Sequence, residues 1–180
     1  MATEKFKALV HYIVASCDDP QRLGATKLNK ILWFADALSY RMTKISITGE
    51  TYVKRQKGPV PKVILQTLRE LKAEGKIHIE EPQFQYEVRR FVSLHRPDAA
   101  MFSPLEIGLV SAVMAHICDR HTATSISDLS HDQIWDAANE GEDLPLYATL
   151  ASQPGEITDE IMAWANNVVE KVEQNRLQAA

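Results

Sequence analysis

The sequence predicts a mainly helical α+β domain, a bundle of five to six helices with a small antiparallel sheet. Three observations support this fold class. Most apolar residues recur at helical spacing, and two stretches near 51–56 and 76–94 alternate between apolar and polar residues as strands do. The chain has 180 residues, of which 45% are hydrophobic, enough for one sizeable core. We therefore expect a single domain over residues 1–180, with residues 173–180 as a frayed tail.

The helices of the first half are placed by apolar stripes and end signals. A first helix is expected over residues 2–17, where Pro20 blocks its continuation. A second helix follows over residues 26–42, with apolar residues at helical spacing. Gly58 and the prolines after it are typical of a helix start, so we expect a third helix over residues 60–74.

The second half gives further end signals. A capping box at 103–106 predicts a helix to about residue 118 that is apolar nearly all round and therefore central. A second cap at 130–133 precedes a short helix, an acidic loop is expected over 139–155, and the last helix begins at residue 158.

The net charge of -4 hides an uneven distribution. Residues 1–79 hold 14 Lys and Arg against 7 Asp and Glu, whereas residues 80–180 hold 6 against 17. Two outcomes are open: a two-faced electrostatic surface, or charges that mix in space once the chain folds. If a partner of this chain acts on nucleic acid, the carboxylates at 128, 132 and 136 are candidates to occupy its basic groove.

The sequence contains none of the common catalytic motifs: no phosphate loop, no dinucleotide-binding glycine pattern, no nucleophile elbow and no zinc-protease signature. Among metal-ligand residue types, only the stretch 116–121 forms a cluster, and on a helix His116 and Cys118 point in different directions. We therefore expect a protein without enzymatic activity, metal or cofactor.

The cysteine content and the hydropathy indicate a protein of the cytoplasm. Cys17 and Cys118 are the only cysteines, and we interpret both as reduced, small, buried apolar residues. No stretch of about 18 apolar residues, the length needed to cross a membrane, occurs in the sequence.

Four short motifs occur in a recognisable order. Residues 27–35 read Lys-Leu-Asn-Lys-Ile-Leu-Trp-Phe-Ala, and Thr48-Gly49-Glu50, Gly58-Pro59-Val60 and Leu129-Ser130-His131 with Trp135 follow. Over roughly residues 5–140 this pattern resembles the SocA-like antitoxins of bacteria and phages, which carry the Panacea domain. Two departures from the family pattern are Trp33, where tyrosine is more usual, and Gln56-Lys57, where an aromatic residue commonly precedes Gly-Pro-Val.

The resemblance implies an antitoxin of a toxin-antitoxin system that neutralises a cognate toxin by direct protein contact. A second mechanism, delivery of the toxin to an ATP-dependent protease, is also open within this family. The sequence does not predict whether the chain self-associates.

The expected docking surface lies on the second helix and on the loop and strand before the Gly58 corner. We expect Gly58 and Pro59 to shape this corner. For His131 and Trp135, packing against each other remains open beside partner contact. The expected partner-binding residues are Lys27, Lys30, Phe34, Tyr52, Lys54, Arg55, Gln56, Lys57, Gly58, Pro59, His131 and Trp135.

A winged-helix-like DNA-binding regulator is the alternative, because three helices followed by a hairpin is its outline. It would use Lys27, Lys30, Arg55, Lys57, Arg89 and Arg90. However, residues 43–59 separate the second and third helices, where a helix-turn-helix has a tight link. Nucleic acid is therefore not the expected partner.

Overall fold

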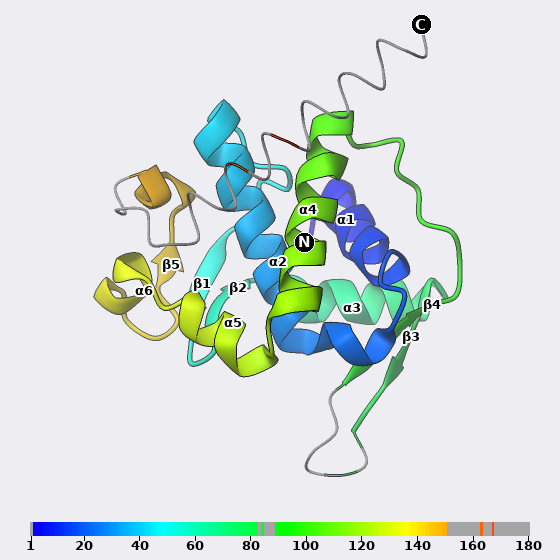
Figure 1. The fold of residues 1–180 in the computed structure, drawn as a ribbon. Coiled ribbons are helices and arrows are strands. Elements are labelled where there is room, and N and C mark those ends of the chain that lie inside the picture. The colour runs from blue at the N-terminus through cyan, green and yellow to red at the C-terminus, as the bar shows by residue number, and fades with distance from the viewer. Residues whose placement is uncertain (1, 83, 85–88, 151–162, 164–166, 168–180) are drawn as a thin grey trace, which may run out of the picture.

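The computed structural model describes residues 2–82, 84, 89–150, 163 and 167 (Figure 1). In chain order the described elements are α1 (Glu4–Ala15), α2 (Pro20–Thr43), β1 (Tyr52–Arg55), β2 (Gly58–Pro61), α3 (Ile64–Ala73), β3 (Ile77–Glu80), β4 (Arg90–Ser93), α4 (Pro104–Arg120), α5 (Ala123–Leu129), α6 (Gln133–Ala137), β5 (Asp143–Leu144) and the short helix η1 (Leu146–Leu150). The mainly helical α+β class predicted from the sequence is confirmed.

The long helix α2 is the centre of the fold. Its predicted apolar stripe is buried and includes Leu28, Ile31, Leu32, Ala35 and Leu38. α2 packs along α4 and contacts both β2 and β4. The β2–β1–β5 sheet and the β3–β4 sheet therefore flank α2 on opposite sides (Figure 1).

The junction between α1 and α2 follows the signals in the sequence. The Thr3 side chain caps α1 by accepting a hydrogen bond from the N–H of Phe6. Asp19 caps α2, and Pro20 occupies its first turn. Gly24 interrupts the helix with φ 60° and ψ 166°, a conformation that glycine adopts without a steric penalty. The regular part of α2 starts after Gly24, as the sequence predicts.

The segment before α3 contradicts the prediction of a helix start at Gly58. Gly58–Pro61 is instead strand β2, antiparallel to β1. Arg55 pairs with Gly58, so Gln56 and Lys57 form a two-residue turn that Gly58 closes with φ 93°. β2 lies at the edge of its sheet, where prolines without an N–H are tolerated. α3 consequently begins later than predicted.

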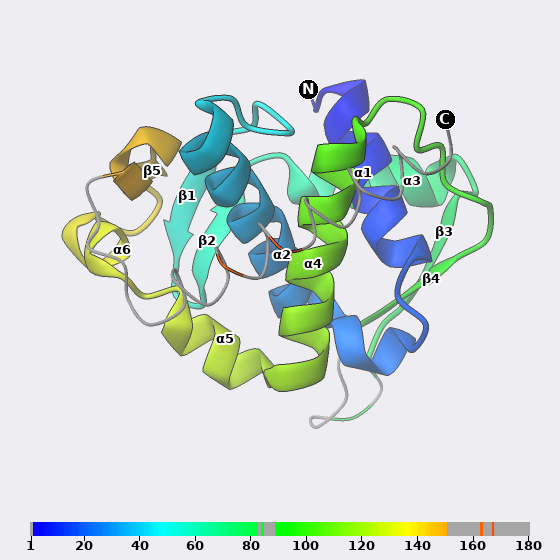
Figure 2. The same ribbon diagram turned by 45° about the horizontal axis from the view of Figure 1, so that its top comes forward.

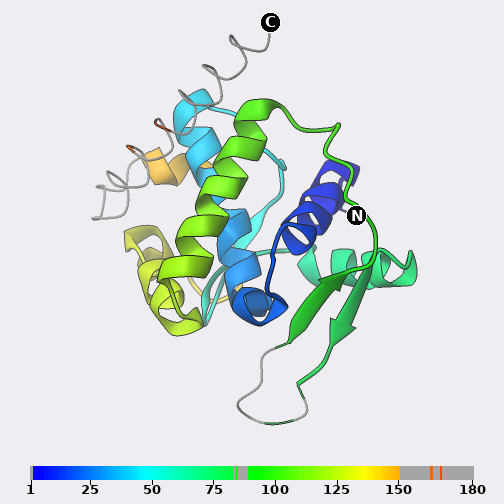
Figure 3. The ribbon, with the colours of Figure 1, turned by 45° about the vertical axis from the view of Figure 1, so that its right-hand side comes forward.

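On the other side of α2, helices α1 and α3 pack against the β3–β4 hairpin (Figure 3). The register pairs Ile77 with Ser93 and Ile79 with Phe91, and Ile77 and Phe91 point into the core. This hairpin confirms the one predicted near 76–94. Most of the residues between β3 and β4 lie outside the residues that the structure describes.

Helix α4 lies alongside α2 (Figure 2). The predicted capping box is present, with Ser103 and Glu106 each accepting a hydrogen bond from the other's backbone N–H. The expectation of a central, buried helix holds only for part of α4, because Ser111 and Ala115 are exposed. α4 therefore buries one broad face and leaves the other at the surface.

After α4 the chain passes through α5 and α6 to the side of β1 (Figure 2). The sequence did not predict α5, which is capped by Thr122. The N-cap of α6 is Asp132, whose side chain accepts hydrogen bonds from two backbone N–H groups. The expected acidic loop at 139–155 contains a strand, because Asp143–Leu144 pairs with β1, and η1 follows it.

The helix predicted from residue 158 and the tail at 173–180 lie outside the described residues. None of the helices in the described part of the chain is both long and apolar enough to cross a membrane.

Candidate partner-binding site at the β1–β2 hairpin

A buried polar network holds the start of β1 against α2. The Asp36 carboxylate is 0% exposed and accepts hydrogen bonds from the Tyr52 hydroxyl at 2.7 Å and the Thr48 N–H at 2.9 Å. The Thr48 hydroxyl also donates to it. Burial raises the pKa of Asp36, and the hydrogen bonds from Thr48 and Tyr52 oppose that rise by stabilising the carboxylate. The Thr48-Gly49-Glu50 motif is thus anchored to α2.

The next contact holds β2 against α2. The Lys30 side chain is 1% exposed, and its Nζ donates a hydrogen bond to the backbone oxygen of Pro59 at 3.1 Å. Burial lowers the pKa of Lys30 to about 7. A Cβ atom on Gly58 would lie 2.5 Å from Lys30 Nζ and 2.1 Å from Ser130 Oγ. Glycine is therefore required where α2, β2 and the end of α5 meet.

The Leu129-Ser130-His131 motif packs against the same hairpin. The His131 and Trp135 rings are stacked, with centroids 3.7 Å apart and an interplanar angle of 13°. Trp135 Nε1 donates a hydrogen bond to the Arg55 backbone oxygen at 3.1 Å, and Lys54 Nζ lies 3.8 Å from the centroid of the indole. The interpretation of His131 and Trp135 as mutually packed residues that satisfy a neighbouring backbone group is confirmed.

The turn of the hairpin is the exposed part of this site. Arg55, Gln56 and Lys57 are exposed, and they follow directly on the anchored strand β1. Lys57 also borders a cleft of about 430 Å³ beside the start of α2 and the N-terminus of α5. We call this cleft, with its cationic residues Arg22, Lys27, Lys57 and Arg89, the basic cleft.

The basic cleft has an unbalanced charge. None of the residues that line it is Asp or Glu. Arg22 and Arg89 form ion pairs with carboxylates outside the lining, at 2.6 Å and 2.9 Å. Lys27 is 8% exposed, and Lys57 has no ion pair among the residues that the structure describes. Lys57 is therefore the cation of the cleft best placed to meet a negatively charged group.

The expectation that the second helix presents its lysines on a docking surface is wrong. Lys27 and Lys30 are buried, and Phe34 is half-buried and packs against the core. These lysines are buried because α2 is covered on a second face in addition to its hydrophobic stripe. β2 and α5 pack on the side where the lysines project, so only tertiary contacts exclude these side chains from water.

The expectation that the corner presents Tyr52 is also wrong, because Tyr52 is buried. Gly58 and Pro59, which were expected to shape the corner, are buried as well, so neither can contact a partner. Sequence reasoning missed Asp36, the acceptor at the centre of the buried network, and it placed Ser130 in a motif without assigning it a role beside Gly58. An acidic residue in the apolar middle of a helix was the signal that could have identified Asp36. That the exposed residues among those expected to bind a partner do contact one remains a prediction.

Ion pairs show that basic residues of the first half lie next to acidic residues of the second half. Four pairs join the basic first half to the acidic second half: Lys5–Glu106, Arg22–Asp119, Arg55–Glu140 and Lys62–Asp143. The alternative in which the charges mix in space is therefore confirmed for these residues. Because Asp132 caps α6, only Asp128 and Asp136 of the three proposed carboxylates project freely enough to test mimicry of nucleic acid.

The histidines near the end of α4 lie closer together than their helical spacing suggests. His121 follows the helix with φ −121° and ψ 143°, and its Nε2 lies 3.3 Å from Nε2 of His116. Cys118 lines a different cavity, with Cys17. Within the described ranges no group of three or more His, Cys, Asp or Glu side chains is arranged to hold a metal ion.

The fold and the site define a small helical α+β domain in which separate sequence motifs meet at one hairpin. A family model described as antitoxin SocA-like, Panacea domain, matches residues 28–136. The match includes the hairpin and the α5–α6 motif, and the chain belongs to this antitoxin family. No curated protein and no solved structure matches the chain.

Proposed function

We propose that this antitoxin neutralises a cognate toxin by direct contact, and that the toxin binds at the exposed turn of the β1–β2 hairpin and the adjoining basic cleft. The observation that carries the proposal is the anchoring of this turn. Trp135 donates a hydrogen bond to the Arg55 backbone, Lys30 donates one to the Pro59 backbone, and Gln56 and Lys57 between them are left exposed. A loop held in one conformation loses little entropy when it binds a partner.

We further propose that the protein acts by binding and not by catalysis. The groups with chemically useful pKa shifts at this site, Lys30 and Asp36, are 1% and 0% exposed, and each is engaged by neighbouring residues. A general acid or base must reach its substrate within hydrogen-bond distance. Their burial therefore favours a structural role over a catalytic one.

The charge of the basic cleft favours a toxin segment with carboxylate side chains. A cationic recess without acidic lining attracts such a segment at long range and fixes its register once bound. Lys57 is the expected principal contact because it is exposed and has no ion pair within the described part of the chain.

Nothing specific favours the DNA-binding alternative. Lys30 is buried, and Arg55, Arg89 and Arg90 are paired with Glu140, Glu81 and Glu80. The β1–β2 hairpin also stands between α2 and α3, where a helix-turn-helix has a short link.

The test is co-expression with the product of the adjacent gene. We expect the toxic protein to become harmless and to co-purify with this chain in a complex free of nucleic acid. Lys57→Glu should weaken the complex by about tenfold or more and reduce protection. The matched control is Lys72→Glu, at an exposed position on α3 across the molecule, which should leave both the affinity and the protection unchanged. Unchanged affinity of Lys57→Glu would show that the cleft is not the contact.

The same cells separate masking from delivery to an ATP-dependent protease, and we propose masking. Masking predicts that the toxin persists at its normal level while its toxicity is lost. A toxin level that falls with the antitoxin, and recovers when the protease is inactivated, would instead show delivery. A third arm uses Asp128→Lys with Asp136→Lys, which should not weaken neutralisation unless these carboxylates mimic nucleic acid.

A further inference from the structure

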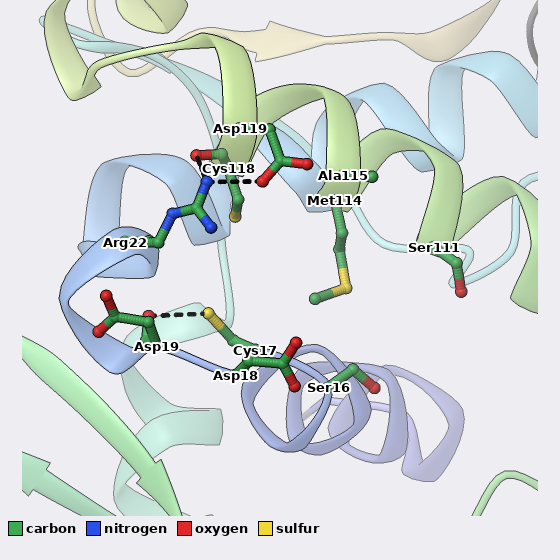
Figure 4. A pocket seen from close by; sticks show the side chains of 10 residues that line it. All are labelled: Ser16, Cys17, Asp18, Asp19, Arg22, Ser111, Met114, Ala115, Cys118 and Asp119. Atoms are coloured by element: carbon green, nitrogen blue, oxygen red, sulfur yellow. Dashed lines mark hydrogen bonds and ion pairs between the residues drawn. The ribbon is translucent and has the colours of Figure 1, made fainter.

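The two cysteines of the chain meet in one cavity, although 100 residues separate them in the sequence. Cys17 follows α1, and Cys118 lies in the last turn of α4. Both line a cavity of about 230 Å³ and are half-buried. Figure 4 shows the two side chains entering this cavity from opposite walls. The prediction that both cysteines are buried is therefore wrong, because each is half-buried, although both pack against the hydrophobic core.

The surroundings of Cys17 favour its ionised form. Cys17 Sγ donates a hydrogen bond to the backbone oxygen of Asp19 at 3.2 Å, and the Arg22 guanidinium, a cation that favours the thiolate, borders the same cavity. The hydrogen bond from Cys118 lowers the pKa of the Cys17 thiol to about 7. The pKa of Cys118 is raised, first by its hydrogen bond with Cys17 and then by burial. The Cys17 thiol therefore ionises more readily than the Cys118 thiol.

We propose that Cys17 and Cys118 are a redox site that forms a reversible intramolecular disulfide when the protein meets a peroxide. The Cys17 thiolate attacks one peroxide oxygen, the O–O bond breaks, and the sulfur becomes a sulfenic acid while the other oxygen leaves as water after taking up a proton. Cys118 then attacks this sulfur, the S–O bond breaks, and a second water is released. The two thiols lose two electrons, and the peroxide gains them.

The position of this pair gives the disulfide a structural effect. It would connect the end of α1 to the end of α4 across the first turns of α2, and it would close a loop that contains most of the described core. Such a long loop restricts the unfolded chain strongly. The oxidised protein should therefore unfold at a higher urea concentration than the reduced protein.

The experiment treats the reduced full chain with hydrogen peroxide at a slight excess and maps its peptides without reductant. We expect one peptide pair, joined through Cys17 and Cys118 with the loss of two hydrogen atoms, that dithiothreitol separates. A monomer that retains both free thiols, or that forms only disulfides between chains, would overturn the proposal.

Three variants test the division of roles. In Cys118→Ser the sulfenic acid on Cys17 should persist and react with dimedone. In Cys118→Ala, which leaves no donor at this position, Cys17 should react more slowly with iodoacetamide near pH 7 than in wild type, because the hydrogen bond from Cys118 is lost. In Cys17→Ser, Cys118 should resist peroxide. Equal reactivity of the two cysteines in these single variants would refute the assignment of Cys17 as the attacking thiol.

Discussion

The buried lysine at the hairpin makes a quantitative prediction about stability and pH. Lys30 has a pKa of about 7 in the folded protein because of burial, against 10.5 as its ordinary value. Between these two values the unfolded chain holds a proton that the folded chain has released. The free energy of unfolding therefore increases with pH in this interval, and the cost of burying the ammonium is complete below pH 7.

Replacing Lys30 by methionine keeps the aliphatic stem and removes the titrating group. The cost of the buried amine at pH 7 is on the order of 4 kcal/mol, from which the lost hydrogen bond to Pro59 subtracts about 1 kcal/mol. Lys30→Met should therefore be more stable than wild type at pH 7. Its advantage should shrink by about 2 kcal/mol between pH 7 and about pH 9, as the folded wild type completes its deprotonation.

The assay is urea unfolding followed by circular dichroism at a series of pH values. The difference in the free energy of unfolding between variant and wild type isolates the contribution of Lys30, because the other titrating groups are the same in both proteins. Lys72→Met, which removes an exposed lysine on α3, is the matched control. A difference between Lys30→Met and wild type that stays constant from pH 7 to about pH 9 would refute the description of Lys30 as a desolvated amine.

Two further variants test the contacts that hold the hairpin. Tyr52→Phe removes the hydroxyl that donates to Asp36 and should lower the free energy of unfolding, measured by urea titration, by about 1.5–3 kcal/mol. The control is Tyr147→Phe, at a side chain that is 65% exposed, which should change the free energy of unfolding by less than about 0.5 kcal/mol. Gly58→Ala should lower the free energy of unfolding by more than about 1 kcal/mol, because the new Cβ has no room and φ is 93°. Gly49→Ala, at φ 70° in open space, should lower it by less. Equal losses of stability in the two variants would contradict the packing argument.

The elements that the sequence predicted correctly are those with a strong local signal. The α2 stripe from Leu28 to Leu38 has a single periodicity over several turns, and the capping box at Ser103 marks the start of α4 within one residue. The β3–β4 hairpin was predicted from the alternation of apolar and polar residues along its strands. In each case neighbours in the sequence supply the decisive interactions.

The elements that were predicted wrongly depend on distant partners. Gly58-Pro59-Val60-Pro61 has the composition of a helix start, but pairing with β1 makes it a strand. α5 has no long apolar stripe and is held by its cap and by contacts with α2. A strand of two residues at Asp143–Leu144 carries no detectable pattern and exists only through pairing with β1.

By itself the sequence determined the family, the fold class and the main helices, because motifs, apolar spacing and caps act over a few residues. Only the tertiary structure decided which motif residues are reachable. A lysine on a helix is normally solvated, and no local pattern shows that β2 and the end of α5 will enclose Lys30. The same applies to Cys17 and Cys118, whose meeting depends on how α1, α2 and α4 pack. Burial is set by the whole fold, so exposure, pKa and reactivity follow from packing and not from spacing.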